Sequence, residues 1–162
     1  MDERHGGAAS EQADDERSDC VFCGIVAGST AADVVFADGV AVAFLDRSPL
    51  MRGHTLVVPR RHVVTLADLP AEEVGPFFER VQHVSRAMPD ALDAQGTFVA
   101  NNNVVSQSVA HLHVHVVPRT RGDGLRGFFW PRSRYEPGES AQFAARLRAA
   151  FEPFTDSDGQ YR

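Results

Sequence analysis

The chain has 162 residues, 43% of them hydrophobic, which is enough to fill one core without a second domain. The formal net charge of −6 argues against general nucleic-acid binding, and much of the acid lies in the first nineteen residues. No apolar run approaches a membrane span and the N-terminus does not resemble a secretory signal, so we expect a cytoplasmic protein with neither nucleic acid nor membrane as partner.

The first nineteen residues contain Asp, Glu, Ser, Gly and Gln with almost no large apolar group. Such a segment cannot bury enough apolar surface to offset the entropy lost on ordering, so residues 1–19 are predicted to be a disordered acidic tail. The last residues, 156–162, are polar and contain glycine, which predicts a frayed end. The ordered part is therefore expected to be one domain over residues 20–155.

Two cysteines open the ordered part as Cys20-Val21-Phe22-Cys23. A disulfide is disfavoured in a cytoplasmic protein, and a thioredoxin-type pair would follow a strand in a βαβ unit, which this sequence does not show. Half of a tetrahedral zinc site is a third interpretation, with His62 and His111 as candidates for the other two ligands. Two reduced thiols packed in a short helix remain the alternative.

A hairpin follows, because Val34–Ala37 and Val40–Leu45 are β-prone and the Asp38-Gly39 pair between them predicts a two-residue turn. Asp46 ends the second strand. A carboxylate that faces a pocket at this position can accept hydrogen bonds from both hydroxyl groups of a ribose. Turn formation also explains an aspartate here. His54–Val58 predicts a further strand, which a proline stops.

A long helix is predicted from Pro70 to about Met88, since apolar residues recur there at helical spacing and two glutamates lie near its N-terminus. Thr97–Ala100 then predicts a strand. Neutral polar side chains of the kind that hold phosphate and sugar oxygens follow it: Asn101, Asn102, Asn103, Ser106, Gln107 and Ser108.

Histidine and apolar residues alternate from His111 to Val116, with imidazoles at His111, His113 and His115. The period of two is typical of a β-strand, so the three rings are expected on one face, about 6.5 Å apart. Three interpretations compete: a solvated strand face, a zinc site, and phosphorus chemistry with one histidine as nucleophile. A solvated strand face is disfavoured, because three of the seven histidines fall in register. The polar side chains before the strand favour phosphorus chemistry.

After this strand, residues 119–135 are rich in arginine and aromatic residues. Forked guanidinium groups suit a substrate with extra phosphates or a second nucleotide, but a solvated loop or a subunit contact explains the same composition. Ser140–Phe151 predicts a short terminal helix. The expected architecture is α+β: an antiparallel sheet of about five strands, one long helix across it, and a short helix at each end of the ordered region.

Four blocks of the chain resemble, in order, those of the histidine triad (HIT) family of nucleotide hydrolases and transferases. The blocks are Cys20–Gly28, Ala43–Pro49, Gly53–His62 and Gln107–Val117. The resemblance covers about residues 20 to 119, and four ordered blocks are far more specific than one short motif.

The resemblance implies a HIT-like fold, a homodimer and a purine nucleotide as substrate. It implies a structural zinc ion bound by Cys20, Cys23, His62 and His111. The expected catalytic residues are His113, His115, Ser108 and His54, the last in support of the triad. The expected nucleotide contacts are Phe22, Ile25, Phe44, Asp46, Asn102, Gln107, Ser108, His113 and His115, although core packing equally explains the three apolar ones. The loop before Gln107 is shorter than is usual in the family, and Ser106 replaces a glycine.

The implied mechanism places His113 at its centre, because a neutral imidazole is a competent nucleophile at neutral pH. One ring nitrogen would attack the α-phosphorus of a nucleoside phosphoramidate or dinucleoside polyphosphate, and water would release the mononucleotide, with no catalytic metal required. In the transferase branch of the family the last triad position is typically glutamine, so His115 favours hydrolysis. A dinucleoside polyphosphate phosphorylase or nucleotidyltransferase and a non-catalytic nucleotide-binding module remain the alternatives.

Overall fold

The structure, a computed structural model, describes residues 19–125 and 133–151. The chain divides between Asp123 and Gly124 into two compact units. The predicted tails fall outside the described residues except for Asp19, as does the stretch 126–132 of the arginine- and aromatic-rich segment. Within the described ranges, no helix is both long and apolar enough to cross a membrane.

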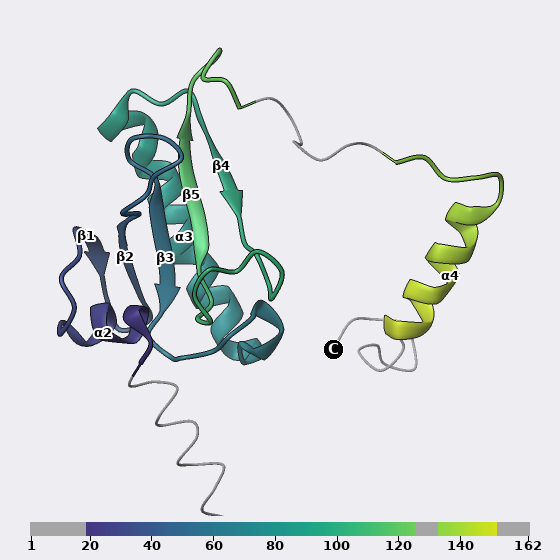
Figure 1. Ribbon diagram of the computed structural model, residues 1–162, viewed down its shortest axis with the longest axis horizontal. Helices are drawn as coiled ribbons and strands as arrows, with labels where there is room; N and C mark the ends of the chain where they lie inside the picture. The colour runs from purple at the N-terminus through teal and green to yellow at the C-terminus, as the bar shows by residue number, and fades with distance from the viewer. Residues whose placement is uncertain (1–18, 126–132, 152–162) are drawn as a thin grey trace, which may run out of the picture. The chain divides into compact units, whose positions relative to one another are not determined.

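The first unit contains one antiparallel sheet of five strands in the order β1-β2-β3-β5-β4 (Figure 1). The strands are β1 Val34–Ala37, β2 Ala41–Leu45, β3 Thr55–Pro59, β4 Gly96–Ala100 and β5 Val114–Arg119. The central strand β3 pairs with both β2 and β5. The predicted five-stranded antiparallel sheet is confirmed.

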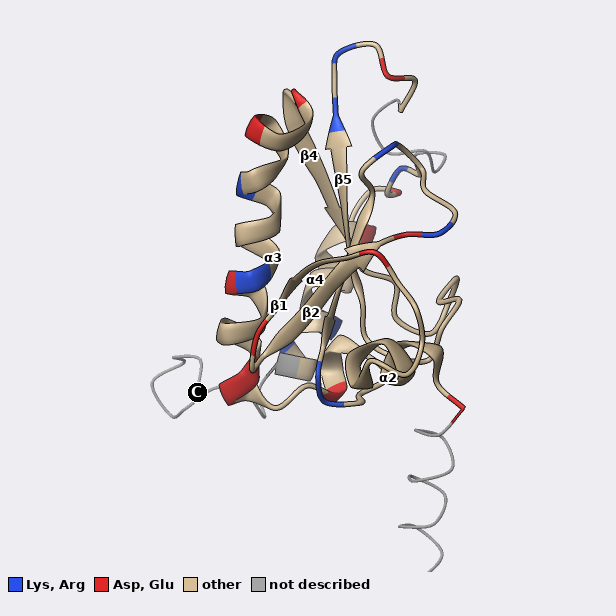
Figure 2. Cartoon of the chain, turned by 90° about the vertical axis from the view of Figure 1, so that its left-hand side faces the viewer, with Lys and Arg blue, Asp and Glu red and all other residues tan. Residues whose placement is uncertain are grey.

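Three α-helices are described: α2 Val21–Ala27, α3 Ala71–Leu92 and α4 Glu139–Phe151, with a 3-10 turn at Leu66–Asp68. The long helix α3 runs along one side of the sheet, and α2 lies on the other side (Figure 2). The α3 helix ends at Leu92 rather than near Met88, so that Pro89 lies inside it. A proline removes one helical hydrogen bond, and here the helix continues past it, with Met88 buried.

Alternate strand residues enter two separate cores, as the period of two requires. The core under α3 contains Ala41, Ala43, Val57, Phe77, Val81, Val84, Met88, Val114 and Val116. The core on the opposite face contains Phe22, Val42, Phe44, Leu56 and Val58. His115 is the partner of Leu56 across the β3–β5 ladder, so its ring belongs to the α2 face. The sheet thus separates α3 from His115.

The connection between β1 and β2 has three residues rather than the predicted two, because β2 begins at Ala41 and not at Val40. The Asp38 side chain explains the difference. Its Oδ1 accepts the N–H groups of Val40 and Ala41 at 2.8 and 3.0 Å. Its Oδ2 accepts from Arg80 Nε on α3 at 2.8 Å. One carboxylate therefore closes the turn and ties the hairpin to the helix.

Strand β5 begins at Val114, so the prediction that His111 and His113 lie within the strand is wrong. Backbone groups of the segment 111–113 form hydrogen bonds outside the sheet. Leu112 N–H donates to the Val63 carbonyl at 2.7 Å, and Asn101 Nδ2 donates to the His113 carbonyl at 2.9 Å. The alternating sequence still brings the rings of His113 and His115 within 5.0 Å of each other.

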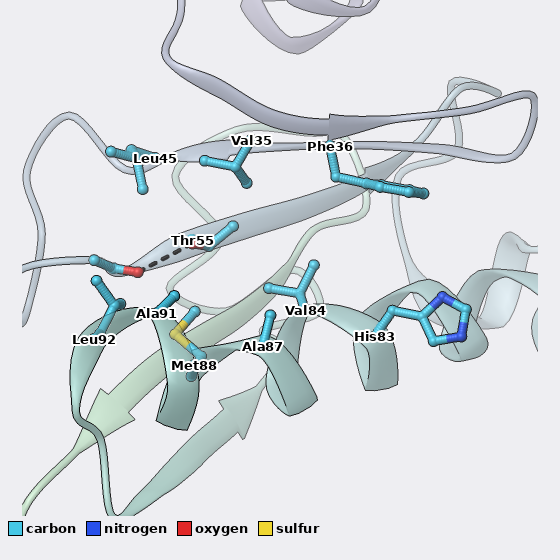
Figure 3. A pocket seen from close by; sticks show the side chains of 11 residues that line it. Val35, Phe36, Leu45, Thr55, His83, Val84, Ala87, Met88, Ala91 and Leu92 are labelled. Carbon is cyan, nitrogen blue, oxygen red and sulfur yellow. Dashed lines mark hydrogen bonds between the residues drawn. The ribbon is translucent and has the colours of Figure 1, made fainter.

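An apolar pocket of about 590 Å³ lies between α3 and the strands β1 to β3 (Figure 3). Figure 3 shows His83 at one end and Leu92 at the other, with Met88 and Val84 between them. None of the residues predicted for the nucleotide or metal site lines this pocket. Phe22, Phe44 and His115, which are among those predicted residues, lie instead on the opposite face of the sheet.

Asp38→Ala is expected to lower the free energy of unfolding by about 2 kcal/mol, since it removes the carboxylate that accepts two backbone N–H groups and pairs with Arg80. Burial raises the pKa of Asp38, but the N–H of Ala41 and the Arg80 guanidinium outweigh it and bring the pKa to about 2. Urea unfolding at neutral pH measures the change. Asp33→Ala, at an exposed aspartate before β1, is the matched control, and an equal loss there would contradict the role of Asp38.

Candidate functional site

Four side chains of the kind that bind metal ions come together beside α2, and they are called the metal-binding cluster below. Cys20 directly precedes the helix, Cys23 lies in its first turn, His62 follows β3 and His111 precedes β5. Cys23 Sγ lies 3.2 Å from His62 Nδ1, and both sulfur atoms lie 3.5 Å from His111 Nδ1. The fold thus assembles the four predicted zinc ligands from three separate parts of the sequence.

These distances match the edges of a tetrahedron around zinc. With Zn–S of about 2.3 Å and Zn–N of about 2.0 Å, a sulfur and a nitrogen ligand lie about 3.5 Å apart. His111 presents Nδ1 to the thiols because its Nε2–H donates to the Pro59 carbonyl at 3.0 Å. Burial lowers the pKa of His111 to about 4, so the ring is neutral at neutral pH, which is the form that binds a metal. The donor set therefore fits zinc.

A chain of hydrogen bonds fixes the tautomers of His54 and His115. The Leu50 N–H donates to His54 Nδ1 at 3.2 Å, and His54 Nε2 lies 2.9 Å from His115 Nδ1. Burial lowers the pKa of both rings, that of His115 to about 4. Because Nδ1 of the neutral His54 ring accepts, its Nε2 carries the proton and donates to His115. His115 therefore keeps its own proton on Nε2.

His113 lies next to His115 and is 1% exposed. Its Nδ1–H donates to the carbonyl of His111 at 2.7 Å, which leaves the lone pair on Nε2. The ring centroid lies 5.0 Å from that of His115 and 5.3 Å from that of Phe22, which meets it edge-on. The arrangement sets an imidazole with a fixed lone pair beside a second imidazole with a fixed N–H.

Apolar residues predicted for the base pocket lie on the same face. Phe22 and Phe44 are buried with their ring centroids 5.3 Å apart, and Ile25 packs against the same cluster. Asp46 follows β2, and its Oδ1 accepts the Ser48 N–H at 2.8 Å. Its Oδ2 lies 3.4 Å from His54 Nδ1. This contact is not an ion pair at neutral pH, because the buried His54 ring is neutral.

The loop between β4 and β5 is held by its own side chains. Gln107 Oε1 accepts the Val104 N–H at 2.8 Å, and its Nε2 donates to the Val64 carbonyl at 2.6 Å. Asn102 Nδ2 donates to the Ser106 carbonyl at 3.3 Å. Val104 and Ser106 have φ angles of 66° and 61°, which are strained for residues with a Cβ atom. Two predicted nucleotide contacts, Gln107 and Asn102, thus have bonds within the protein.

Ser108 is exposed and lines a hollow together with Cys20 and His62, beside the metal-binding cluster. Sequence reasoning missed Asn101, whose amide bonds the His113 carbonyl, and the Leu50 N–H that sets the His54 tautomer. The run of three asparagines indicated the region of Asn101 without distinguishing it. No side-chain pattern marks a backbone amide such as that of Leu50.

The family model described as "HIT domain" matches residues 27–122. The chain belongs to the HIT domain family. Among HIT relatives, "Protein hit" of Bacillus subtilis is 35% identical over 140 residues, which cover 81% of this chain and 96% of that protein. Adenylylsulfatase HINT3 of Arabidopsis thaliana is 32% identical over a match that covers 67% of this chain and 56% of the HINT3 chain. The adenosine 5′-monophosphoramidase of Schizosaccharomyces pombe is 28% identical over a match that covers 74% of this chain and 89% of that protein.

Solved HIT structures have the same fold. The crystal structure of a HIT family member from Bacillus subtilis superposes with a TM-score of 0.74 at 31% identity, covering 81% of this chain and 96% of that one. A zinc-bound histidine triad protein from Mycobacterium smegmatis superposes with a TM-score of 0.65 at 37% identity, covering 83% and 99%. The α+β HIT fold is thereby confirmed, and zinc binding occurs in a protein similar to this one.

His62→Asn is expected to weaken zinc binding at least about 100-fold, because it removes one of the four converging donors. Metal analysis after dialysis against a mild chelator measures the bound zinc. His83→Asn, at an exposed histidine of α3 on the other side of the sheet, is the matched control and should retain zinc. Equal zinc contents in the two variants would remove His62 from the site.

The free energy of unfolding is expected to fall as the pH drops from about 6.5 toward 4. Burial places the pKa of His54 and His115 below the unfolded value of about 6.5, so the unfolded chain takes up more protons in this range. Urea titrations across the range measure the slope. His115→Gln should make the slope shallower, since one buried titrating ring is gone, and an unchanged slope would contradict this assignment.

Proposed function

We propose that this protein is a nucleotide hydrolase that cleaves at the α-phosphate of a nucleoside phosphoramidate or dinucleoside polyphosphate. The reaction proceeds through a nucleotide bound covalently to His113. Relatives named as an adenylylsulfatase and as an adenosine 5′-monophosphoramidase support an adenylyl group as the transferred unit. Adenine is a purine, so the names of these two relatives agree with the proposed purine nucleotide substrate.

One observation carries the proposal, namely the hydrogen bond from His113 Nδ1–H to the His111 carbonyl at 2.7 Å. It leaves the lone pair of this tautomer on Nε2, the ring nitrogen that can attack an electrophile. When Nε2 bonds to phosphorus the imidazole becomes positively charged. The same carbonyl oxygen then lies next to Nδ1–H, where it stabilises that charge.

In the first step, His113 Nε2 forms a bond to the α-phosphorus while the bond from phosphorus to the leaving group breaks. The leaving group departs with the bonding electron pair and takes up a proton from solvent. His115 donates its Nε2–H as a hydrogen bond to a phosphoryl oxygen, and Ser108 is assigned a second one. His115 keeps its proton, because a neutral imidazole N–H is a good donor but a poor acid.

In the second step, water attacks phosphorus and gives up a proton to solvent as the N–P bond breaks, which returns the lone pair to Nε2 and releases the mononucleotide. His54 acts as a positioning residue, since its Nε2–H fixes His115. Asp46 is assigned to the ribose hydroxyls, Phe22, Ile25 and Phe44 to the base. Asn102 and Gln107 are assigned to the phosphate through the loop that they brace.

Zinc is proposed as a structural ion held by Cys20, Cys23, His62 and His111, where it would link α2 to the segments before β5 and after β3. Its bonds would replace the long contacts between the thiols and the imidazoles. The steps above use no catalytic metal. A homodimer, a cytoplasmic location and the lack of nucleic-acid and membrane partners stay predictions.

His113→Ala is expected to lower kcat at least about 10³-fold on adenosine 5′-phosphoramidate while changing AMP affinity by less than about threefold. The nucleophile is lost, but the base and ribose contacts remain. Rapid quench of the unchanged protein into alkaline denaturant, in which an N–P bond to histidine survives, should trap a nucleotidyl-protein that the variant does not form.

His83→Ala, at the exposed α3 histidine, is the control for this variant and should turn over normally. Retained turnover by His113→Ala would exclude the mechanism. AMP binding without a trapped intermediate or turnover would instead support a non-catalytic binding module. With diadenosine polyphosphate and added inorganic phosphate, release of ADP in place of AMP would identify a phosphorylase.

A further inference from the structure

The metal-binding cluster and the nucleophile share a residue. The His111 ring faces the two thiols through Nδ1, while the carbonyl of the same residue accepts the Nδ1–H of His113. Both rings are at most 1% exposed. The peptide that carries this carbonyl is also held by the Leu112 N–H, which donates to the Val63 carbonyl at 2.7 Å. The position of the His111 ring and this bond together set the direction of the carbonyl that fixes the His113 tautomer.

Phe22 provides a second link between the same two sites. It lies between Cys20 and Cys23 in the sequence, at the start of a helix of seven residues. Its ring centroid lies 5.3 Å from that of His113 and 6.0 Å from that of His111, edge-on in both cases. A shift of the two thiols would therefore move the ring that packs against the nucleophile.

The contacts that join the two thiols to the histidines are weak, because a thiol is a weak hydrogen-bond donor and acceptor. The sulfur to Nδ1 distances of 3.2 to 3.5 Å are those of ligands around one ion rather than of strong bonds between the side chains themselves. Bonds to zinc are the strong connection that this arrangement can make. Apolar packing and a 3.4 Å contact between Arg60 and the Val26 carbonyl also join α2 to the rest of this unit.

We propose, on the basis of the proposed function, that this cluster is a positioning site for His113 and not only a brace for the fold. Metal held by Cys20, Cys23, His62 and His111 fixes the His111 peptide and the Phe22 ring. These two contacts keep His113 in the tautomer and orientation that present Nε2 to phosphorus. Cys20, Cys23 and His111 act as positioning residues, since none of them contacts the reacting atoms.

Stability alone does not separate the two roles, because losing a structural metal destabilises a protein in either case. The distinguishing measurements are made well below the unfolding temperature, where all the proteins compared are folded. They are the ¹⁵N chemical shifts of the His113 ring, which report its tautomer, and the rate of nucleotidyl-protein formation in a single turnover. Metal content, AMP affinity and Tm are measured alongside.

The test compares the zinc-loaded protein with Cys23→Ser and with the chelated unchanged chain. We expect both metal-free proteins to lose the single Nδ1–H tautomer of His113 and to form the intermediate at least about tenfold more slowly, with AMP affinity within about threefold. Adding zinc back to the chelated chain should restore both. Val84→Ala, in the core under α3, is the stability control and should lower Tm without changing the His113 spectrum or the rate.

Metal-free protein that is folded, with an unchanged His113 spectrum and rate, would overturn the inference while leaving the hydrolase proposal intact. If chelation unfolds the unchanged chain, the metal is a requirement of the fold and the positioning role is likewise excluded. If the zinc-loaded protein forms no intermediate, the proposed function fails, and the His113 spectrum still decides whether the metal sets its tautomer.

Discussion

Burial of neighbouring imidazoles is the constraint from which the site follows. His54, His111 and His113 are each at most 2% exposed, so a ring N–H that is cut off from water needs a partner within the protein. The carbonyls of Pro59 and His111 meet this requirement, and the Leu50 N–H bonds the unprotonated nitrogen of His54. In the part of the chain that the structure describes, no buried side-chain nitrogen or oxygen lacks a partner. Backbone geometry therefore decides which nitrogen of each ring carries the proton.

The fold provides those backbone groups by ending its strand pairing early. The β3–β5 ladder stops at the pair of Val57 and Val114, which leaves the peptide groups of residues 111–113 available for other bonds. The Leu112 amide bonds Val63, and the His113 carbonyl bonds Asn101. A strand continued through this segment would use these groups in the sheet instead. The rigid core under α3 holds the sheet while the opposite face carries the rings.

The alternation of histidine and apolar residues was enough to predict a sheet with imidazoles on one face, and the ordered blocks were enough to predict the family. The hairpin turn and the start of β5 were predicted wrongly, because a side chain or a distant amide competes there with strand pairing. Asp38 in the turn and Asn101 beside His113 are the competing groups. The alternation of polar and apolar residues along one strand contains no information on side chains from other segments that bond to its backbone. The tautomers could not be predicted either, since backbone groups from other segments set them.

The loop from Asn101 to Gln107 forms its bends without glycine. Val104 and Ser106 both adopt left-handed backbone angles, and side-chain hydrogen bonds from within the loop and from Gln107 hold them there. Strain of about 1–3 kcal/mol per residue is tolerated only where the surroundings leave no other choice of conformation. The conformational entropy of this loop is thus lost during folding, before any ligand arrives. Under the proposed function, a phosphate at this loop would meet a preorganised surface and would not have to order the loop itself.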